Sequence, residues 1–134
     1  MVDPKIFAAF IRDAELENIK LVSVDSALGE ELGKGKSYNL SLKTKFPFKK
    51  NETCVFIFPT YKVFFEDDEG NNSGIFTFKC EFSLHYRVNN IDKYTDDLVK
   101  YFADNNAKFN SWSYFRELLS NVTMRMGIGP LVAP

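Results

Sequence analysis

The sequence predicts an α+β fold: a four-stranded antiparallel sheet with C-terminal helices packed on one face, preceded by a short N-terminal helix. Two patterns lead to this prediction. Apolar and polar side chains alternate along much of residues 19–88, as they do in half-buried strands. Near the N-terminus and after residue 94, apolar residues recur instead at helical spacing. The 134 residues suit one domain, which we expect to span residues 1–134.

Composition places the chain among globular proteins and argues against one class of partner. Hydrophobic residues make up 45% and charged residues 26% of the sequence, a balance typical of a folded domain. Lys and Arg total 17 against 18 Asp and Glu, which gives a net charge of −1. A protein that holds nucleic acid with its whole surface needs a basic excess, so we expect no nucleic-acid partner.

Aromatic residues are numerous, with 14 Phe, 6 Tyr and 1 Trp. A domain of this size leaves much of its surface exposed, so a monomer would struggle to bury every ring. We therefore expect part of this surplus to serve association or binding.

A short amphipathic helix is predicted from residue 4 to about residue 15. Asp3 is placed as its N-cap and Pro4 as its first helical residue. Its apolar side chains follow at helical spacing, and they are Ile6, Phe7, Phe10, Ile11 and Ala14. We interpret this face as packing against the domain, with binding of a partner as the alternative.

Three of the four predicted strands have one simple pattern each. Residues 19–25 form a short β-branched run, and residues 27–37 then read as a loop. Residues 38–46 alternate between an apolar and a polar face, and residues 47–51 break this strand. Residues 75–88 alternate over their whole length, so they should form a long hairpin with the strand before them.

The remaining strand, residues 52–66, is apolar on both faces. Pro59 lies within it and predicts a bulge, a bend or an edge position. Neither face suits water, so we interpret one face as covered by the helices. The other face should be covered by a second subunit or should help to form a binding groove.

The C-terminal third predicts two helices. Thr95 should cap a short one that ends near residues 104–106, and Asn110 or Ser111 should cap a longer one. Gly127 and Pro130 should end the second helix. Its apolar stripe, which we interpret as core, consists of Trp112, Phe115, Leu119, Val122 and Met126.

Motifs for chemistry are missing from the sequence. One histidine, His85, and two cysteines, Cys54 and Cys80, offer none of the ligand spacings of zinc sites. We find no catalytic signature and no phosphate-binding loop, so we expect no enzyme, cofactor or metal. No segment resembles an export signal or a membrane span, and a cytoplasmic location is expected.

Residues 109–119 (FNSWSYFRELL), with MRMG at 124–127 and PLVAP at 130–134, resemble the end of the SecB-like export chaperones. In that family a long helix carries a Tyr/Phe-x-Arg-Glu core, here at residues 114–117. A glycine and a short extended Leu-x-x-Pro segment follow it, here at residues 127 and 131–134. The order of the four strands and the short helix matches the family as well.

This resemblance implies a function as well as a fold. It implies a holdase that works without ATP, assembles as a homotetramer (a dimer of dimers) and binds unfolded or pre-secretory client chains in hydrophobic grooves. It also implies delivery of clients to the SecA motor. The sequence ends at Pro134 without the extended tail of the best-known members, and its N-terminal helix is similar to that of SecB-like proteins from toxin–antitoxin systems. An antitoxin is therefore the alternative partner, and a small-ligand-binding α+β domain is the alternative from another class.

Candidate client-binding residues are aromatic side chains of the second and third predicted strands and of the break between them, together with one methionine off the apolar stripe of the long helix. Such side chains suit sequence-tolerant contacts. They are Phe46, Phe48, Phe56, Phe58, Tyr61, Phe64 and Met124. For Phe46 and Phe48, anchoring of a loop on the core is the alternative. The acidic cluster Glu66, Asp67, Asp68 and Glu69 is either a solvated turn or a contact for a basic or zinc-bearing partner domain.

Overall fold

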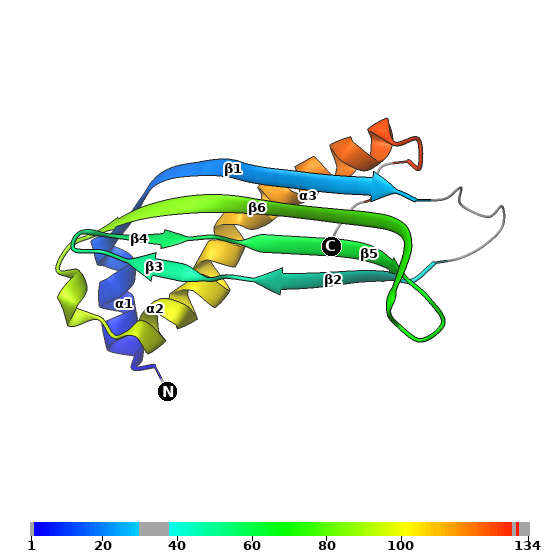
Figure 1. Cartoon of the computed structure of the whole chain (residues 1–134). Helices are drawn as coiled ribbons and strands as arrows, with labels where there is room; N and C mark the ends of the chain where they lie inside the picture. Colours follow the sequence, from blue (N-terminus) through cyan, green and yellow to red (C-terminus); the bar gives the residue numbers. More distant parts are fainter. Residues whose placement is uncertain (1, 30–37, 130, 132–134) are drawn as a thin grey trace.

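The computed structural model describes residues 2–29, 38–129 and 131 (Figure 1). The predicted loop at 27–37 and the C-terminal tail from Pro130 onward lie largely outside these residues. The elements in chain order are α1 (Pro4–Asp13), β1 (Ala14–Leu28), β2 (Leu40–Lys45), β3 (Phe48–Lys50), β4 (Cys54–Ile57), β5 (Thr60–Glu66), β6 (Asn72–Val88), the 3-10 helix η1 (Ile91–Lys93), α2 (Asp96–Phe102), the π-helical turn η2 (Ala103–Ala107) and α3 (Lys108–Arg125).

The six strand segments form one antiparallel sheet that is four strands wide (Figure 1). β1 pairs with one edge of β6, while β5 and β4 share the other edge. β2 and β3 pair in turn with β5 and β4. The predicted four-stranded antiparallel sheet is therefore confirmed, and two of its strands are each interrupted once.

Both interruptions lie at prolines. The predicted strand 52–66 is broken at Phe58 and Pro59, and the pairing register to β6 is the same on both sides of the break. The expectation that residues 47–51 end the neighbouring strand is wrong, because β3 resumes at Phe48. Pro47 has no N–H to donate to the Phe58 carbonyl, and the Thr60 hydroxyl donates to that carbonyl instead, at 3.3 Å. The Pro47 carbonyl still accepts a hydrogen bond from the Phe58 N–H, at 2.8 Å.

The first strand is longer than its sequence pattern indicates. β1 covers residues 14–28 because all of it pairs with β6, from Ala14 opposite Val88 to Leu28 opposite Phe76. The register is irregular between Leu16 and Asn18 and between Leu21 and Ser23. The helix before it accordingly ends at Asp13, two residues early. As predicted, Asp3 caps this helix, and its carboxylate accepts a hydrogen bond from the Lys5 N–H at 2.8 Å.

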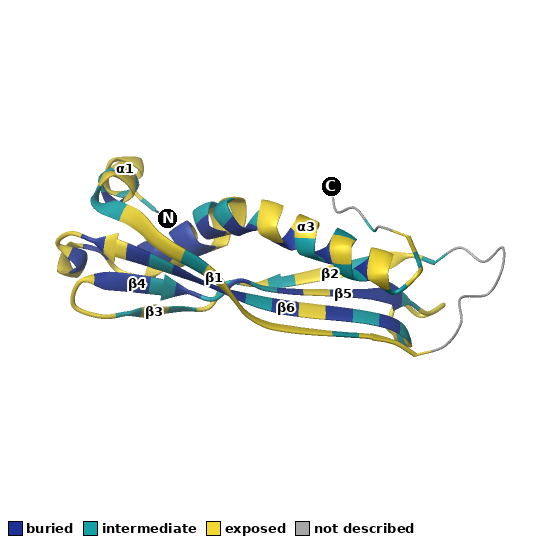
Figure 2. Cartoon of the chain, turned by 90° about the horizontal axis from the view of Figure 1, so that it is seen from above, coloured by how far each residue is buried: buried dark blue, intermediate teal, exposed yellow. Residues whose placement is uncertain are grey.

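The two predicted C-terminal helices are continuous. Thr95 caps α2, but neither Asn110 nor Ser111 caps α3, because the π-helical turn η2 carries the chain from one helix into the next. Ser111 instead lies within α3, where its hydroxyl donates to the Ala107 carbonyl oxygen at 2.8 Å. This long helical run crosses one face of the sheet (Figure 2).

The core lies between this face and the helices. Phe115 of α3 is fully buried, and its ring stacks on that of Tyr61 with centroids 4.3 Å apart. At the other end, Phe10 of α1 packs edge-on against Tyr94 and Phe102. The expected packing of α1 against the domain is therefore present. No helix in the described ranges is long and apolar enough to span a membrane.

Candidate functional site

A groove runs between the β2–β3 edge of the sheet and the helical run from α2 to α3. It consists of two adjoining hollows of about 710 and 910 Å³, and Lys108 lines both. Phe46, Pro47 and Phe48 line the first hollow from the sheet side. We call the combined hollow the edge groove; its further lining residues are Leu42, Thr44, Lys45, Lys100, Asp104, Asn105, Phe109, Asn110, Trp112 and Ser113.

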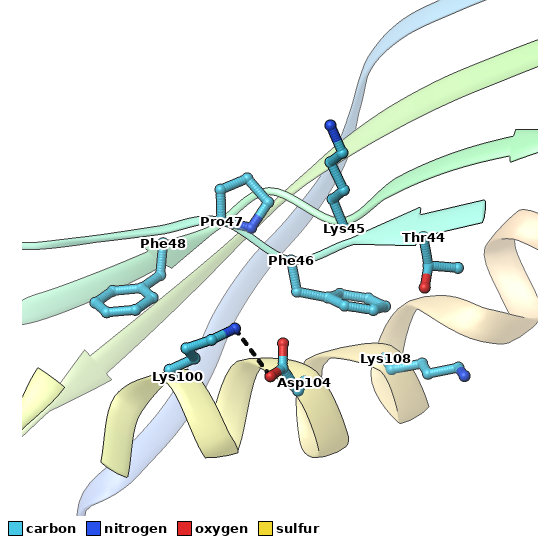
Figure 3. A pocket seen from close by; sticks show the side chains of 8 residues that line it. All are labelled: Thr44, Lys45, Phe46, Pro47, Phe48, Lys100, Asp104 and Lys108. Atoms are coloured by element: carbon cyan, nitrogen blue, oxygen red, sulfur yellow. Dashed lines mark hydrogen bonds and ion pairs between the residues drawn. The ribbon is translucent and has the colours of Figure 1, made fainter. Parts of the chain in front are cut away.

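The sheet side of the edge groove is aromatic. The side chains of Phe46 and Phe48 point toward the helices, whereas that of Lys45 points to the opposite side (Figure 3). Phe46 packs edge-on against Tyr61, with ring centroids 6.0 Å apart. Both Phe46 and Phe48 are only half-buried. They are thus anchored on the core and still present ring surface to the groove.

The helix side adds a second pair of aromatic residues. Phe109 is 82% exposed, and Trp112 is half-buried beneath the Lys108 ammonium, whose nitrogen lies 5.6 Å from the ring centroid. The π-helical turn supplies Asp104 and Asn105 to the lining. Such turns shift the face that a helix presents and are frequent at functional sites.

Charged groups line the rim of the groove rather than its floor. Lys100 and Asp104 form an ion pair at 3.1 Å along the helix surface (Figure 3). Lys108 is exposed, whereas the Lys45 ammonium lies on the other side of the strand. An apolar floor with exposed charged side chains around it suits a polypeptide segment better than a small molecule, because the hollows are open and extended.

The groove also borders an unsatisfied strand edge. None of the described residues pairs with the outer edge of β2 and β3. The carbonyls of Asn39 and Pro47 accept inward hydrogen bonds from Glu66 and Phe58. In an antiparallel ladder inward and outward groups alternate, so the backbone groups of every second residue from Leu40 to Phe48 point outward. An extended peptide could pair with them.

Two of the candidate client-binding residues are inaccessible, which corrects their expected role. Tyr61 is fully buried, and its hydroxyl lies 2.6 Å from the hydroxyl of Ser111. Burial raises the pKa of Tyr61 to about 12, against the smaller lowering effect of that hydrogen bond. Phe64 lies on the opposite face of the sheet and is 3% exposed. Both rings are covered within the monomer, so neither needs a partner.

The other candidates lie away from the edge groove. Phe56 is on the opposite face, where its ring stacks on that of His85 at 4.6 Å. Phe58 is half-buried in the break between β4 and β5. Met124 is 57% exposed near the C-terminal end of α3. Of the seven candidates, the structure brings only Phe46 and Phe48 together in the groove.

The acidic cluster forms the β5–β6 turn. The Asp67 carboxylate accepts hydrogen bonds from the N–H groups of Glu69 and Asn71, both at 2.9 Å, and so shapes the turn. Asp68 and Glu69 are exposed and Glu66 is half-buried. A contact with a basic partner domain stays a prediction for these residues.

Sequence patterns missed Leu42, Phe109 and Trp112 as groove residues. Trp112 belongs to the apolar stripe of α3 and was expected in the core, and its ring does contact core residues while also lining the groove. Phe109 lies off that stripe. An aromatic residue in such a position is the sequence signal that could have identified Phe109 as a groove residue. Leu42 was expected to be covered because it lies on the apolar face of its strand.

The two cysteines and the histidine do not form a site. Cys54 and Cys80 are both buried and free, and they lie on opposite faces of the sheet, as their pairing with β6 and β5 shows. Burial raises the pKa of Cys80 to about 12. Among the residues that the structure describes, no group of three or more His, Cys, Asp or Glu side chains is placed to hold a metal ion.

This chain matches known proteins in its three-dimensional structure but not in its sequence. No family model matches the sequence, and no curated protein matches it. A similar solved structure is the Mycobacterium tuberculosis Rv1957 SecB-like chaperone in complex with a ChAD peptide from the Rv1956 HigA1 antitoxin. The TM-score is 0.84 at 15% sequence identity, and the match covers 97% of this chain and 95% of the other. The chain therefore has the fold of the SecB-like chaperones.

Proposed function

We propose that this protein is an ATP-independent chaperone that holds an extended, unfolded client segment in the edge groove. The observation that carries the proposal is an aromatic groove beside an open strand edge in a SecB-like fold. Holding a chain requires no bond-making step. It requires apolar contact area and backbone hydrogen bonds, and the groove offers both.

The energetics suit reversible holding of many sequences. Each aromatic or aliphatic client side chain that leaves water for the groove contributes on the order of 1.5–3 kcal/mol. Part of this is lost in ordering the client, so a single groove holds a segment only weakly. Linked grooves in an oligomer would strengthen the hold through effective concentration.

We favour an antitoxin as the dedicated client of this chaperone. The structurally similar mycobacterial protein is a SecB-like chaperone bound to an antitoxin peptide. The rival within the same class is a general export chaperone that passes pre-secretory proteins to SecA. The two differ in selectivity: the first holds one antitoxin segment far more tightly than unrelated unfolded chains, and the second does not.

The test combines a general and a specific measurement. At near-stoichiometric ratio and without nucleotide, we expect the protein to suppress aggregation of chemically denatured luciferase, followed by light scattering. Fluorescence anisotropy then compares labelled antitoxin segments, the ChAD peptide of HigA1 among them, with unfolded export precursors. Equal affinities would favour the export function, and failure with every client would overturn the proposal.

We also propose self-association, as a dimer of dimers, through β1. This strand forms the other edge of the sheet, and its helix-side face leaves Leu16, Leu21, Val24 and Leu28 exposed. Tyr114 and Leu118 of α3 line a hollow of about 330 Å³ against it. A long apolar edge strand invites pairing with its own copy about a two-fold axis.

Light scattering tests this assembly. We expect a mass about four times the 15.4 kDa of one chain. Leu21→Asp with Val24→Asp should lower the mass while preserving the far-ultraviolet circular dichroism, because both side chains are exposed. The control Asn18→Asp lies on the opposite face of the same strand, opposite His85, and should keep the assembly. A wild-type mass of one chain would contradict the proposal.

A further inference from the structure

The outer face of the β2–β3 edge is lined with lysine. The register places Ser41, Lys43 and Lys45 of β2 and Lys49 of β3 on the sheet face opposite the helices, because their pairing partners Phe64, Lys62, Thr60 and Phe56 lie there. All three lysines are exposed. Within the described ranges none of them forms an ion pair.

Two more lysines extend this charge across the sheet. Lys43 is directly opposite Lys62, and Lys62 is directly opposite Lys79. Like charges in directly opposed positions destabilise a sheet. The ammonium groups of Lys43 and Lys62 lie 5.7 and 5.8 Å from the ring centroid of Phe64, which partly steadies them. Lys79 is in turn directly opposite Asp25 of β1, so the uncompensated positive charge lies toward the β2–β3 edge, where a carboxylate from a partner would neutralise it.

The helix-side face of the same edge is apolar. Leu42, Phe46 and Phe48 line the edge groove, and Figure 3 shows Phe46 and Phe48 pointing to one side of the strand and Lys45 to the other. The open edge of one strand therefore separates an aromatic surface from a basic one.

A peptide that pairs with this edge must present its side chains to both surfaces in turn. Successive side chains of any strand point to opposite faces of the sheet, whether the strand runs parallel or antiparallel to β2. Residues of the added strand would therefore alternate between the edge groove and the row of Lys43, Lys45 and Lys49. Apolar residues suit the first environment and acidic residues the second.

Resting on the proposed function, we propose that the preferred client is an extended segment in which apolar residues alternate with Asp or Glu. The specificity lies in the pattern rather than in the composition. A segment with the same residues in two blocks also alternates its side chains between the two faces. It therefore places some apolar side chains against the lysine row and some acidic side chains in the edge groove. A segment that alternates apolar and basic residues meets Lys43, Lys45 and Lys49 with like charge.

The test uses four labelled eight-residue peptides with uncharged ends, checked to be monomeric and measured by fluorescence anisotropy. Three alternate Leu with Glu, Gln or Lys, and the fourth has the Leu and Glu residues in two blocks. We expect the Leu/Glu alternation to bind about tenfold or more tighter than the Leu/Lys alternation, because three modest surface ion pairs replace three repulsions. The affinity of the Leu/Gln peptide should lie between these two. The block peptide should bind more weakly than the Leu/Glu alternation, and added salt should reduce the differences in affinity between the charged peptides.

A charge-reversal variant provides the decisive comparison. Lys43→Glu with Lys45→Glu and Lys49→Glu should bind the Leu/Lys peptide in preference to the Leu/Glu peptide. The control Lys5→Glu with Lys93→Glu and Arg116→Glu makes the same charge change at exposed positions outside the edge and should keep the wild-type order. Equal binding of the Leu/Glu and Leu/Lys peptides, or an order unchanged in the variant, would overturn the inference and leave the proposed function in place. If the protein bound denatured luciferase or an antitoxin segment but none of the four peptides, the inference would also be overturned. If it bound neither luciferase nor antitoxin segments, the proposed function itself would be overturned.

Discussion

Phe46→Asp combined with Phe48→Asp is expected to weaken client binding by roughly 10- to 100-fold. Both rings line the edge groove and are half-buried in the free protein, so a client covers only part of each. Half of the usual 1.5–3 kcal/mol for each ring amounts to about 1.5–3 kcal/mol in all, and each 1.4 kcal/mol is a factor of about ten in affinity. The carboxylates add a cost when a client removes their water. Anisotropy with a labelled client segment measures the loss.

Two further variants show whether a loss of binding comes from the groove itself. One controls for the added charge and the other for damage to the fold. Asn71→Asp with Asn89→Asp adds the same two charges at exposed turn positions outside the groove and should leave the affinity unchanged. Phe109→Ala removes an 82% exposed ring from the helix side of the groove and should weaken binding without affecting the fold. If both groove variants held clients as tightly as the wild type, the edge groove would not be the binding site.

Phe115→Ala is expected to lower the free energy of unfolding by about 3–5 kcal/mol, the usual range for a buried ring. Phe115 is fully buried, stacks on Tyr61 at 4.3 Å and also contacts Phe78 and Trp112. Its removal leaves a cavity where α3 rests on the sheet, and much of the stability of a domain this small depends on that contact. Urea denaturation followed by circular dichroism measures the change.

Phe109→Ala is the matched control for stability, since it deletes the same ring six residues earlier on the helix. It should change the free energy of unfolding by no more than about 0.5 kcal/mol because the ring is exposed. The two variants thus separate the roles of α3: Phe115 stabilises the fold and Phe109 serves the groove. Similar losses of stability in both would show that Phe109 packs on the domain in solution.

Most of the fold could be predicted from local pattern. Alternation located the strands at residues 38–46 and 75–88, and the doubly apolar run 52–66 was correctly placed as an inner strand with a disturbance at Pro59. β1 was predicted too short because its ends are held by pairing with β6 rather than by their own composition. The cap at Asn110 or Ser111 was wrong because a π-helical turn joins the two helices, and no residue pattern marks such a turn reliably.

The candidate site was only partly predictable. Phe46 and Phe48 were predicted as client-binding rings because they lie at a strand interruption. The structure places both in the groove, and their contact with a client stays a prediction. Tyr61 and Phe64 looked equally available in the sequence, yet one is buried under α3 and the other on the opposite face beside two lysines. Contacts between distant segments decide which face of the sheet a helix covers, so the periodicity of one segment cannot predict that face.

The aromatic surplus illustrates this division between local and long-range information. Composition and periodicity were enough to establish that a single small domain holds more rings than it easily buries, and that they lie mainly on strands and on one long helix. Only the packed chain decided which rings are covered. Phe64, Tyr61 and Phe115 are covered within the monomer, while Phe46, Phe48 and Phe109 line the edge groove from its two sides. The physical reason is that burial is a property of pairs of surfaces, and the second surface of each pair comes from a part of the chain far away in sequence.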